Sequence, residues 1–211
     1  MLFTTIDFVV FFIFVLAALV IIKNRKIQHL ILLVASYFFF YYTSNYLIVL
    51  LIFSTILDFY VGQKIYDTIS AQRKKILLIL SLSGNLGLLG FFKYTNFAID
   101  QFNTIGIFLN NSEQLSPLEI ILPIGISFYT FQTISYTVDI YRGKLTPSKS
   151  LSEFALFVAF FPQLVAGPIL RASEFLPQLR EKIEKFEAKE KLRQILLNEV
   201  NLKAGITLMA L

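Results

Sequence analysis

The sequence predicts an all-α protein whose helices cross a membrane several times. Two observations lead to this fold class. Of the 211 residues, 56% are hydrophobic and only 16% are charged, and the apolar residues gather in long runs separated by short charged segments. A soluble core cannot bury so much apolar surface. A helix of roughly 20 mainly apolar residues crosses a hydrocarbon layer about 30 Å thick, so the chain has room for several spans.

The candidate spans follow one another along the chain, and the last one is irregular. Asp7 precedes the first run and no small-residue cleavage site follows it, so we expect that run to remain in the mature protein. Pro162, Gly167 and Pro168 interrupt the last run, which predicts a re-entrant or kinked helix near residues 155–170. The expected spans are Phe8–Ile22, Ile27–Tyr42, Tyr46–Val61, Ile76–Phe92, Leu118–Val138 and the broken stretch Leu151–Leu170.

Basic residues fall in every second loop, and this pattern predicts the orientation of the spans. Lys and Arg accumulate in the short cytoplasmic loops of membrane proteins. The loop Thr43–Asn45 is uncharged and Lys93–Pro117 has little positive charge, so we expect both loops outside. The sequence thereby predicts a multi-pass protein of the cell membrane with its N-terminus outside. The loops expected inside contain Lys23, Arg25 and Lys26, then Lys64, Arg73, Lys74 and Lys75, then Arg142, Lys144 and Lys149.

The C-terminal part of the chain is expected to leave the membrane and return to it. Residues 171–193 are dense in charge, with Glu181 and Lys185 at i, i+4 spacing, which predicts a solvated cytoplasmic helix. A basic patch for anionic lipid is the alternative. The apolar stretch Ile195–Leu211 ends at the last residue. We therefore expect residues 1–211 to be the N-terminal part of a single membrane-embedded domain that continues further.

Few polar residues lie deep in the predicted spans, and each is a candidate for function because burying it is costly. Asp58 is expected near the cytoplasmic end of its span, where it reaches water. Asn85, beside Gly84, is expected to hydrogen-bond to a neighbouring helix. His29 is the one histidine and is expected at the interface without a catalytic role. Because these residues include no cysteine and one histidine, neither a thiolate nor a multi-histidine metal site is expected.

The segment Leu122–Gly143, LPIGISFYTFQTISYTVDIYRG, carries the largest group of polar residues. On a helix, Tyr129, Gln132, Thr133 and Tyr136 recur at i, i+3, i+4 and i+7 and therefore share one face. Two interpretations are open: this face lines a polar cavity, or it hydrogen-bonds to other helices.

Two motifs in this half of the chain resemble a known family. The segment LPIGISFYTFQTISYTVDIYRG, followed after a short loop by FVAFFPQLVAGPILR at Phe157–Arg171, resembles the membrane-bound O-acyltransferases (MBOAT family), in the branch of the alginate O-acetylation membrane proteins. Two earlier segments agree, LILLVASYFFFYY at Leu30–Tyr42 and LSLSGNLGLLGFFKYTNF at Leu80–Phe97. The resemblance covers nearly the whole chain. It implies a ring of helices around a central tunnel.

The resemblance also implies an O-acetyltransferase with a cytoplasmic acyl donor, such as acetyl coenzyme A, as substrate and with no bound cofactor or metal. The acceptor would be an extracytoplasmic polysaccharide or an acetyl-transfer partner protein, with no nucleic acid involved. The family's catalytic histidine has no match here, so no catalytic residue is assigned and this part alone is expected to be inactive. The residues implied to shape the tunnel and its cytoplasmic mouth are Tyr129, Gln132, Asp139, Tyr141, Arg142, Gln163, Gly167, Pro168 and Arg171.

Three alternatives to this function stay open at the level of the sequence. Teichoic-acid D-alanylation is a related acyl transfer. A transporter or flippase using the Gln132 face as a pathway belongs to another class, and internal repeats of broken helices would favour it. A purely structural membrane subunit is the third.

Overall fold

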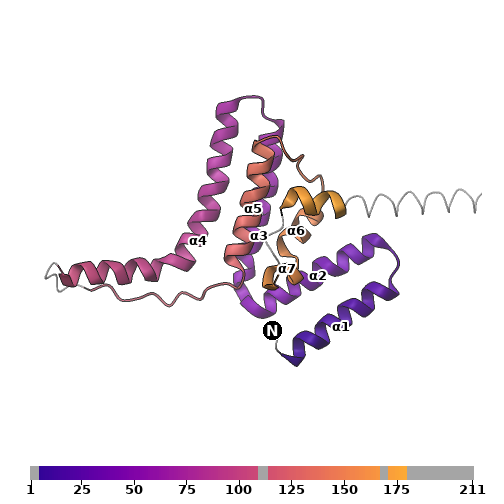
Figure 1. Ribbon diagram of the computed structural model, residues 1–211, viewed down its shortest axis with the longest axis horizontal. Coiled ribbons are helices and arrows are strands. Elements are labelled where there is room, and N and C mark those ends of the chain that lie inside the picture. The colour runs from indigo at the N-terminus through magenta and orange to yellow at the C-terminus, as the bar shows by residue number, and fades with distance from the viewer. Residues whose placement is uncertain (1–4, 109–113, 167–170, 180–211) are drawn as a thin grey trace, which may run out of the picture.

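The computed structural model describes residues 5–108, 114–166 and 171–179, and the regular structure in these ranges is entirely helical. The predicted all-α class is therefore confirmed. Two of the described stretches, Arg25–Asp67 and Ala71–Phe108, are long and apolar enough to cross a membrane. In chain order the elements are α1 (Ile6–Ile21), α2 (Arg25–Ser44), the 3-10 turn η1 (Asn45–Leu47), α3 (Ile48–Asp67), α4 (Ala71–Phe108), α5 (Ile126–Tyr141), α6 (Leu151–Ala159) and α7 (Phe161–Ala166) (Figure 1). A helical segment at 172–179 follows.

Helix α3 lies at the centre of the molecule, with α4, α5 and α6 packed against it (Figure 1). It lies close to α5 at Gly62, where an added methyl group would lie 2.8 Å from Cε1 of Tyr136. The ring of Tyr136 in turn packs on that of Phe154, with centroids 4.2 Å apart. Because Gly62 has no side chain, the two helices come close enough to bury Tyr136 completely.

Helices α1 and α2 form a hairpin whose turn is held by two side chains. Asn24 caps α2, since its side-chain oxygen accepts a hydrogen bond from the backbone N–H of Lys26 at 2.9 Å. The Nε2 of Gln28 donates to the carbonyls of Leu19 and Ile22, both at 2.7 Å. These carbonyls lie at the end of α1, where a helix leaves them without intrahelical partners. The side chains of α2 therefore complete the hydrogen bonding of α1.

Helix α4 is much longer than its predicted span, Ile76–Phe92. It runs for 38 residues to Phe108, about 57 Å at 1.5 Å per residue, and Figure 1 shows it bending so that its second part points away from the bundle. The prediction of a loop from Lys93 onward was therefore wrong as far as Phe108. The segment 93–108 is not continuously apolar, but it contains no proline to stop the helix.

Two asparagines fasten an extended segment along the second part of α4. Asn96 donates to the carbonyl of Leu118 at 2.8 Å and accepts from its N–H at 2.9 Å. Asn103 makes the same pair of bonds with Leu115, both at 2.8 Å. A side-chain amide offers one donor and one acceptor side by side, as a neighbouring strand would. We call residues 93–108 and 114–118 together the clipped arm.

Helix α5 begins later than predicted. The expected span Leu118–Val138 is not helical over residues 118–123, and the helix starts at Ile126. Gly125 precedes it with φ 74°, a left-handed conformation that suits glycine, and Pro123 lies two residues earlier. The N–H of Ile124 donates to Ser44 Oγ at 3.2 Å, which ties the entry of α5 to the end of α2.

The irregular stretch after Leu151 is a broken helix. Helix α6 ends at Ala159, Phe160 has ψ 101°, and α7 starts at Phe161. Pro162 explains the break, because it has no N–H with which to continue α6 but fits the first turn of α7. The freed N–H of Phe161 donates to Ser36 Oγ of α2 at 3.3 Å. The predicted interruption is thus confirmed, and a side chain of α2 satisfies the freed N–H.

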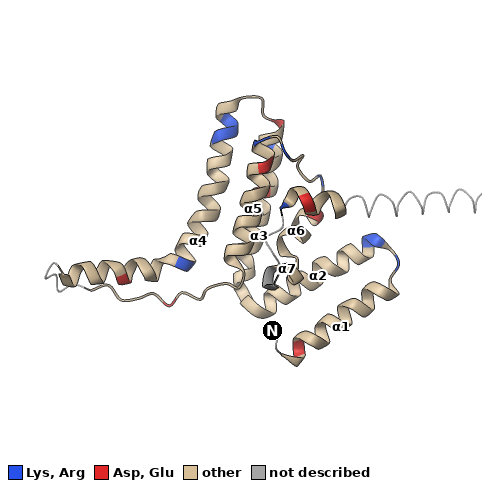
Figure 2. Cartoon of the chain, viewed as in Figure 1, with Lys and Arg blue, Asp and Glu red and all other residues tan. Residues whose placement is uncertain are grey.

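The turn between α3 and α4 and the loop after α5 lie at the same end of the bundle (Figure 2). Their basic residues gather there, and Gln63 Nε2 of α3 donates to the carbonyl of Ser148 at 3.5 Å. Of the predicted charged helix 171–193, only residues 171–179 are described, and 172–179 are helical. The remainder of that helix and the stretch Ile195–Leu211 lie outside the described residues.

Candidate functional site

Helix α5 presents buried polar groups on two sides, one toward α3 and α4 and the other toward α2 and α6. The four residues predicted to share a face, Tyr129, Gln132, Thr133 and Tyr136, are each at most 2% exposed. The structure separates them by their partners. Thr133 belongs to a hydrogen-bond network with α3 and α4, whereas Gln132 contacts α6.

Asp58 is the centre of the first side. It is 0% exposed, and its carboxylate accepts hydrogen bonds from the hydroxyls of Ser81 and Thr137 and from Asn85 Nδ2, the last two at 3.1 and 2.7 Å. The expectation that Asp58 reaches water was therefore wrong, because its side chain faces α4 and α5. Burying a carboxylate is costly unless donors surround it, and here three do.

Asn85 extends the network on the same side. Its Oδ1 accepts from the hydroxyl of Ser54 and lies 3.3 Å from Thr133 Oγ1, while its Nδ2 also lies 3.0 Å from the carbonyl of Ser81. The predicted interhelical hydrogen bond of Asn85 is confirmed. We call the group of Ser54, Asp58, Ser81, Asn85, Thr133 and Thr137 the Asp58 network.

The second side of α5 is buried but not fully hydrogen-bonded. Gln132 Nε2 donates to the carbonyl of Phe157 at 3.3 Å, yet Gln132 Oε1 and the hydroxyl of Tyr129 are buried without a partner among the described residues. The ring of Tyr129 packs edge-on against Phe40, with centroids 6.1 Å apart. Buried polar groups usually have partners, so a buried group without one needs an explanation, such as a role in catalysis.

The remaining residues implied by the family resemblance lie toward the end of α5 and beyond α6. Asp139 accepts a hydrogen bond from Ser173 Oγ at 3.4 Å, which connects α5 to the segment 172–179. Tyr141 and Arg142 are exposed where α5 ends, Gln163 is buried in α7, and Arg171 is exposed where the segment 172–179 begins. Gly167 and Pro168 lie outside the described residues.

The structure brings together the four segments that carry the family resemblance. Ser36, in the segment Leu30–Tyr42, bonds to Phe161 in the second motif. Gln132 in the first motif bonds to Phe157 in the second, and Asn85, in the segment Leu80–Phe97, bonds to Thr133 in the first. The motifs are therefore the contact surfaces of one helical assembly, which their order along the chain did not reveal.

The arrangement supplies no complete catalytic group within the described residues. His29 lies at the start of α2, half-buried, and none of the described contacts joins it to the polar sides of α5. No group of three or more His, Asp or Glu side chains in the described part is placed to hold a metal ion. What α5 offers instead is a fixed helix with unpaired polar atoms facing α2 and α6.

Curated proteins of similar sequence include two O-acetylating classes. The chain is 41% identical over 139 residues to "Probable alginate O-acetylase AlgI" of Pseudomonas aeruginosa, covering 63% of this chain and 26% of that protein. It is 42% identical over 132 residues to the Azotobacter vinelandii protein of the same name, covering 61% and 26%. It is 39% identical over 156 residues to "Peptidoglycan O-acetyltransferase" of Helicobacter pylori, covering 63% and 29%.

These relatives confirm the resemblance to the alginate O-acetylase branch. The chain spans about a quarter of the length of the curated relatives it matches. No family model matches the chain, and no solved structure matches it.

Proposed function

We propose, on the premise that this chain is a relative of the alginate and peptidoglycan O-acetyltransferases, that it forms the N-terminal part of a membrane-bound O-acyltransferase. The full-length protein would transfer an acetyl group from a cytoplasmic donor such as acetyl coenzyme A to an extracytoplasmic polysaccharide, or to a partner protein that acetylates it. The observation that carries the proposal is the joining of all four resembling segments by hydrogen bonds between α2 and α7, between α4 and α5, and between α5 and α6.

The chemistry explains what such a framework would do. Transfer of an acyl group to a sugar hydroxyl needs a base for the hydroxyl proton and donors for the developing oxyanion. A histidine from the rest of the protein would be the base. In this chain, the O–H of Tyr129 and the Oε1 of Gln132 lie on the side of α5 that faces the broken helix, so they would line the passage and orient the acyl group.

The orientation in the membrane is part of the proposal. Basic residues gather at the end of the bundle where α3 meets α4 and α5 ends (Figure 2), and such an end is favoured in the cytoplasm. The clipped arm leaves the bundle at the opposite end of α4 (Figure 1). The donor would then enter from the basic end and the acceptor from the arm end, with several helices spanning the membrane and the N-terminus outside.

Two measurements test the function. Deleting the gene in the source organism should lower the O-acetyl content of its surface polysaccharide, measured as acetate released by mild base, and restoring the full-length gene should return it. Unchanged acetyl content after deletion would rule the proposal out. A transporter would instead alter acceptor export and leave the acetyl content per sugar constant.

A substitution links the activity to this chain. In the full-length protein, Gln132→Leu should lower acetyl transfer about tenfold or more, the scale of losing one positioned polar group. Ser135→Ala is the matched control, because within the described residues the Ser135 hydroxyl bonds to the carbonyl of Gln132 in its own helix, at 2.8 Å. If Gln132→Leu folds and retains full activity, Gln132 does not line the passage and the chain acts as a structural subunit there.

A further inference from the structure

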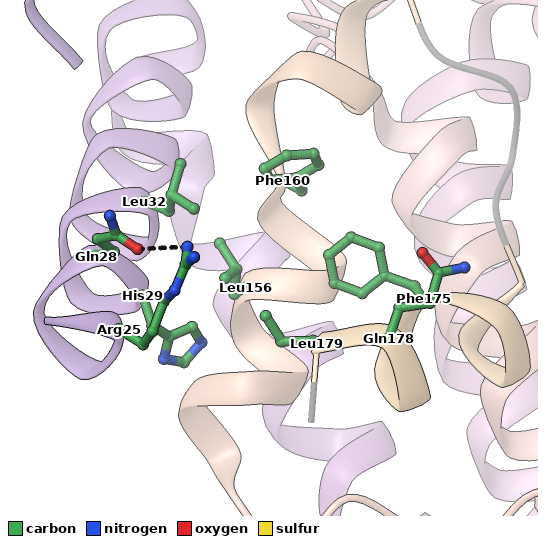
Figure 3. A pocket seen from close by; sticks show the side chains of 9 residues that line it. All are labelled: Arg25, Gln28, His29, Leu32, Leu156, Phe160, Phe175, Gln178 and Leu179. Carbon is green, nitrogen blue, oxygen red and sulfur yellow. Dashed lines mark hydrogen bonds between the residues drawn. The ribbon is translucent and has the colours of Figure 1, made fainter. Parts of the chain in front are cut away.

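A cavity of about 260 Å³ opens between the first turns of α2, helix α6 and the segment 172–179 (Figure 3). One wall carries the polar side chains of α2, which are Arg25, Gln28 and His29. The opposite walls are apolar apart from Gln178 and are formed by Leu156, Phe160, Phe175 and Leu179. Of the described residues assigned to the acyl-transfer passage, none lines this cavity.

Arg25 is held in a fixed position on the polar wall. Its Nη1 donates to Gln28 Oε1 at 2.9 Å. Gln28 is itself fixed, because its Nε2 donates to the carbonyls of Leu19 and Ile22. A guanidinium has five N–H donors, so the bond to Gln28 leaves most of them for a ligand while setting the direction of the group.

The rest of the polar wall also favours a negative charge. The wall lies in the first turn of α2, where the helix dipole is positive. His29 contributes Nε2, which is buried without a hydrogen-bond partner among the described residues. Glu153 and Glu174 lie on the neighbouring elements but do not line the cavity, and Glu153 accepts a hydrogen bond from Ser148 Oγ at 3.1 Å.

We infer that this cavity binds a phosphate-bearing amphiphile, an anionic phospholipid. The phosphate would lie against Arg25 and His29, and an acyl chain would lie on Phe160 and Phe175. Arginine pairs with phosphate through two parallel N–H donors, which accounts for the charged wall. The apolar walls account for the chain, because a free phosphate would gain nothing from aromatic rings.

Residues 1–211 contain no tryptophan, so in the full-length protein the signal of one introduced here is the quenching that it adds to that of the unmodified protein. The variant Phe175→Trp, reconstituted in lipid nanodiscs, would be titrated with phosphatidylglycerol brominated on its acyl chains, which quenches nearby tryptophan. The brominated phosphatidylglycerol should quench the tryptophan at a lower mole fraction than brominated phosphatidylcholine does. Adding Arg25→Gln should raise the half-quenching fraction about fivefold or more, the scale of a charged hydrogen bond. Arg73→Gln, which removes an exposed arginine of α4, should leave it unchanged.

The remaining arms separate the possible outcomes. Arg25→Lys keeps the charge and should restore part of the affinity, and Phe160→Trp replaces the reporter if Phe175→Trp does not fold. Displacement of the brominated lipid by millimolar inorganic phosphate would keep the phosphate site but overturn the lipid as its source. Equal quenching by both lipids, or no effect of Arg25→Gln in a folded variant, would overturn the inference.

Discussion

The two polar sides of α5 are equally buried but differ in how their hydrogen bonds are satisfied. Toward α3 and α4, the carboxylate of Asp58 and the amide oxygen of Asn85 both have donors. Toward α2 and α6, the hydroxyl of Tyr129 and the Oε1 of Gln132 have no hydrogen-bond partner among the described residues. Hydrogen bonds on one side therefore fix the position of the helix, whereas polar atoms on the other side can still bond to a substrate. The first side should determine stability and the second should determine activity.

The largest expected effect is that of Asp58→Leu. The change leaves the donors of Ser81, Asn85 and Thr137 buried without their acceptor, and we expect a loss of about 3–5 kcal/mol in the free energy of unfolding. Unfolding in a denaturing detergent series measures it. Asp67→Leu is the control, because Asp67 is exposed at the end of the same helix and should cost less than about 0.5 kcal/mol.

Gly62→Ala should cost less but still destabilise the protein. Its new methyl group would lie 2.8 Å from the ring of Tyr136, which is fully buried and packs on Phe154. We expect a loss of about 1–3 kcal/mol in the free energy of unfolding, measured in the same detergent series. At Gly90 nothing lies within 4 Å of an added methyl group, so Gly90→Ala should be neutral or stabilising. Equal effects at the two glycines would show that α3 and α5 are not in close contact.

Thr137→Val tests a single donor of the Asp58 network. Valine keeps the shape of threonine but removes the hydroxyl that lies 3.1 Å from Asp58 Oδ1, so the free energy of unfolding should fall by about 1–2 kcal/mol. In a protein that already carries Asp58→Leu, Thr137→Val should lower the free energy of unfolding by less than it does alone, because the two residues share one interaction. Strict additivity in the unfolding series would mean that the two side chains do not interact.

Tyr129→Phe should have the smallest effect on stability and the clearest effect on function. Removing a buried hydroxyl that has no partner in the described part of the chain should leave the free energy of unfolding unchanged or raise it by up to about 1 kcal/mol. Acetyl transfer by the full-length protein should fall in the same variant. A variant that loses stability and keeps its activity would reverse the distinction between the two sides of α5.

Continuous apolar runs in the sequence predicted most of the helices. They failed to predict helical structure where polar residues interrupt the apolar pattern. The spans from Phe8 to Phe92 correspond to α1–α4, and the break near residues 155–170 lies at Phe160. The second part of α4 was missed because polar residues such as Asn96 and Asn103 interrupt its apolar pattern. Those residues bond to Leu118 and Leu115, which only the folded chain brings near.

The candidate site shows the same limit. The face shared by Tyr129 and Gln132 follows from helical spacing and was predicted. The burial of Asp58 was not, because it depends on Ser81 and Thr137, which lie 23 and 79 positions further along the chain. Hydrogen-bond partners at such separations leave no local pattern. Polar residues at regular spacing in neighbouring spans, such as Ser81 with Asn85 and Thr133 with Thr137, were the available signal.

The hydrogen bonds of the clipped arm require two matching distances, one along α4 and one along the segment beside it. On α4, the seven residues from Asn96 to Asn103 rise about 10.5 Å, and on the extended segment the three residues from Leu115 to Leu118 span about 10 Å. Both asparagine side chains can form their hydrogen bonds only because these two lengths agree. One residue inserted between the asparagines would turn the second amide by about 100° around the helix, away from Leu115. We therefore expect the clipped arm to tolerate changes in its other side chains better than a change in the number of residues between Asn96 and Asn103.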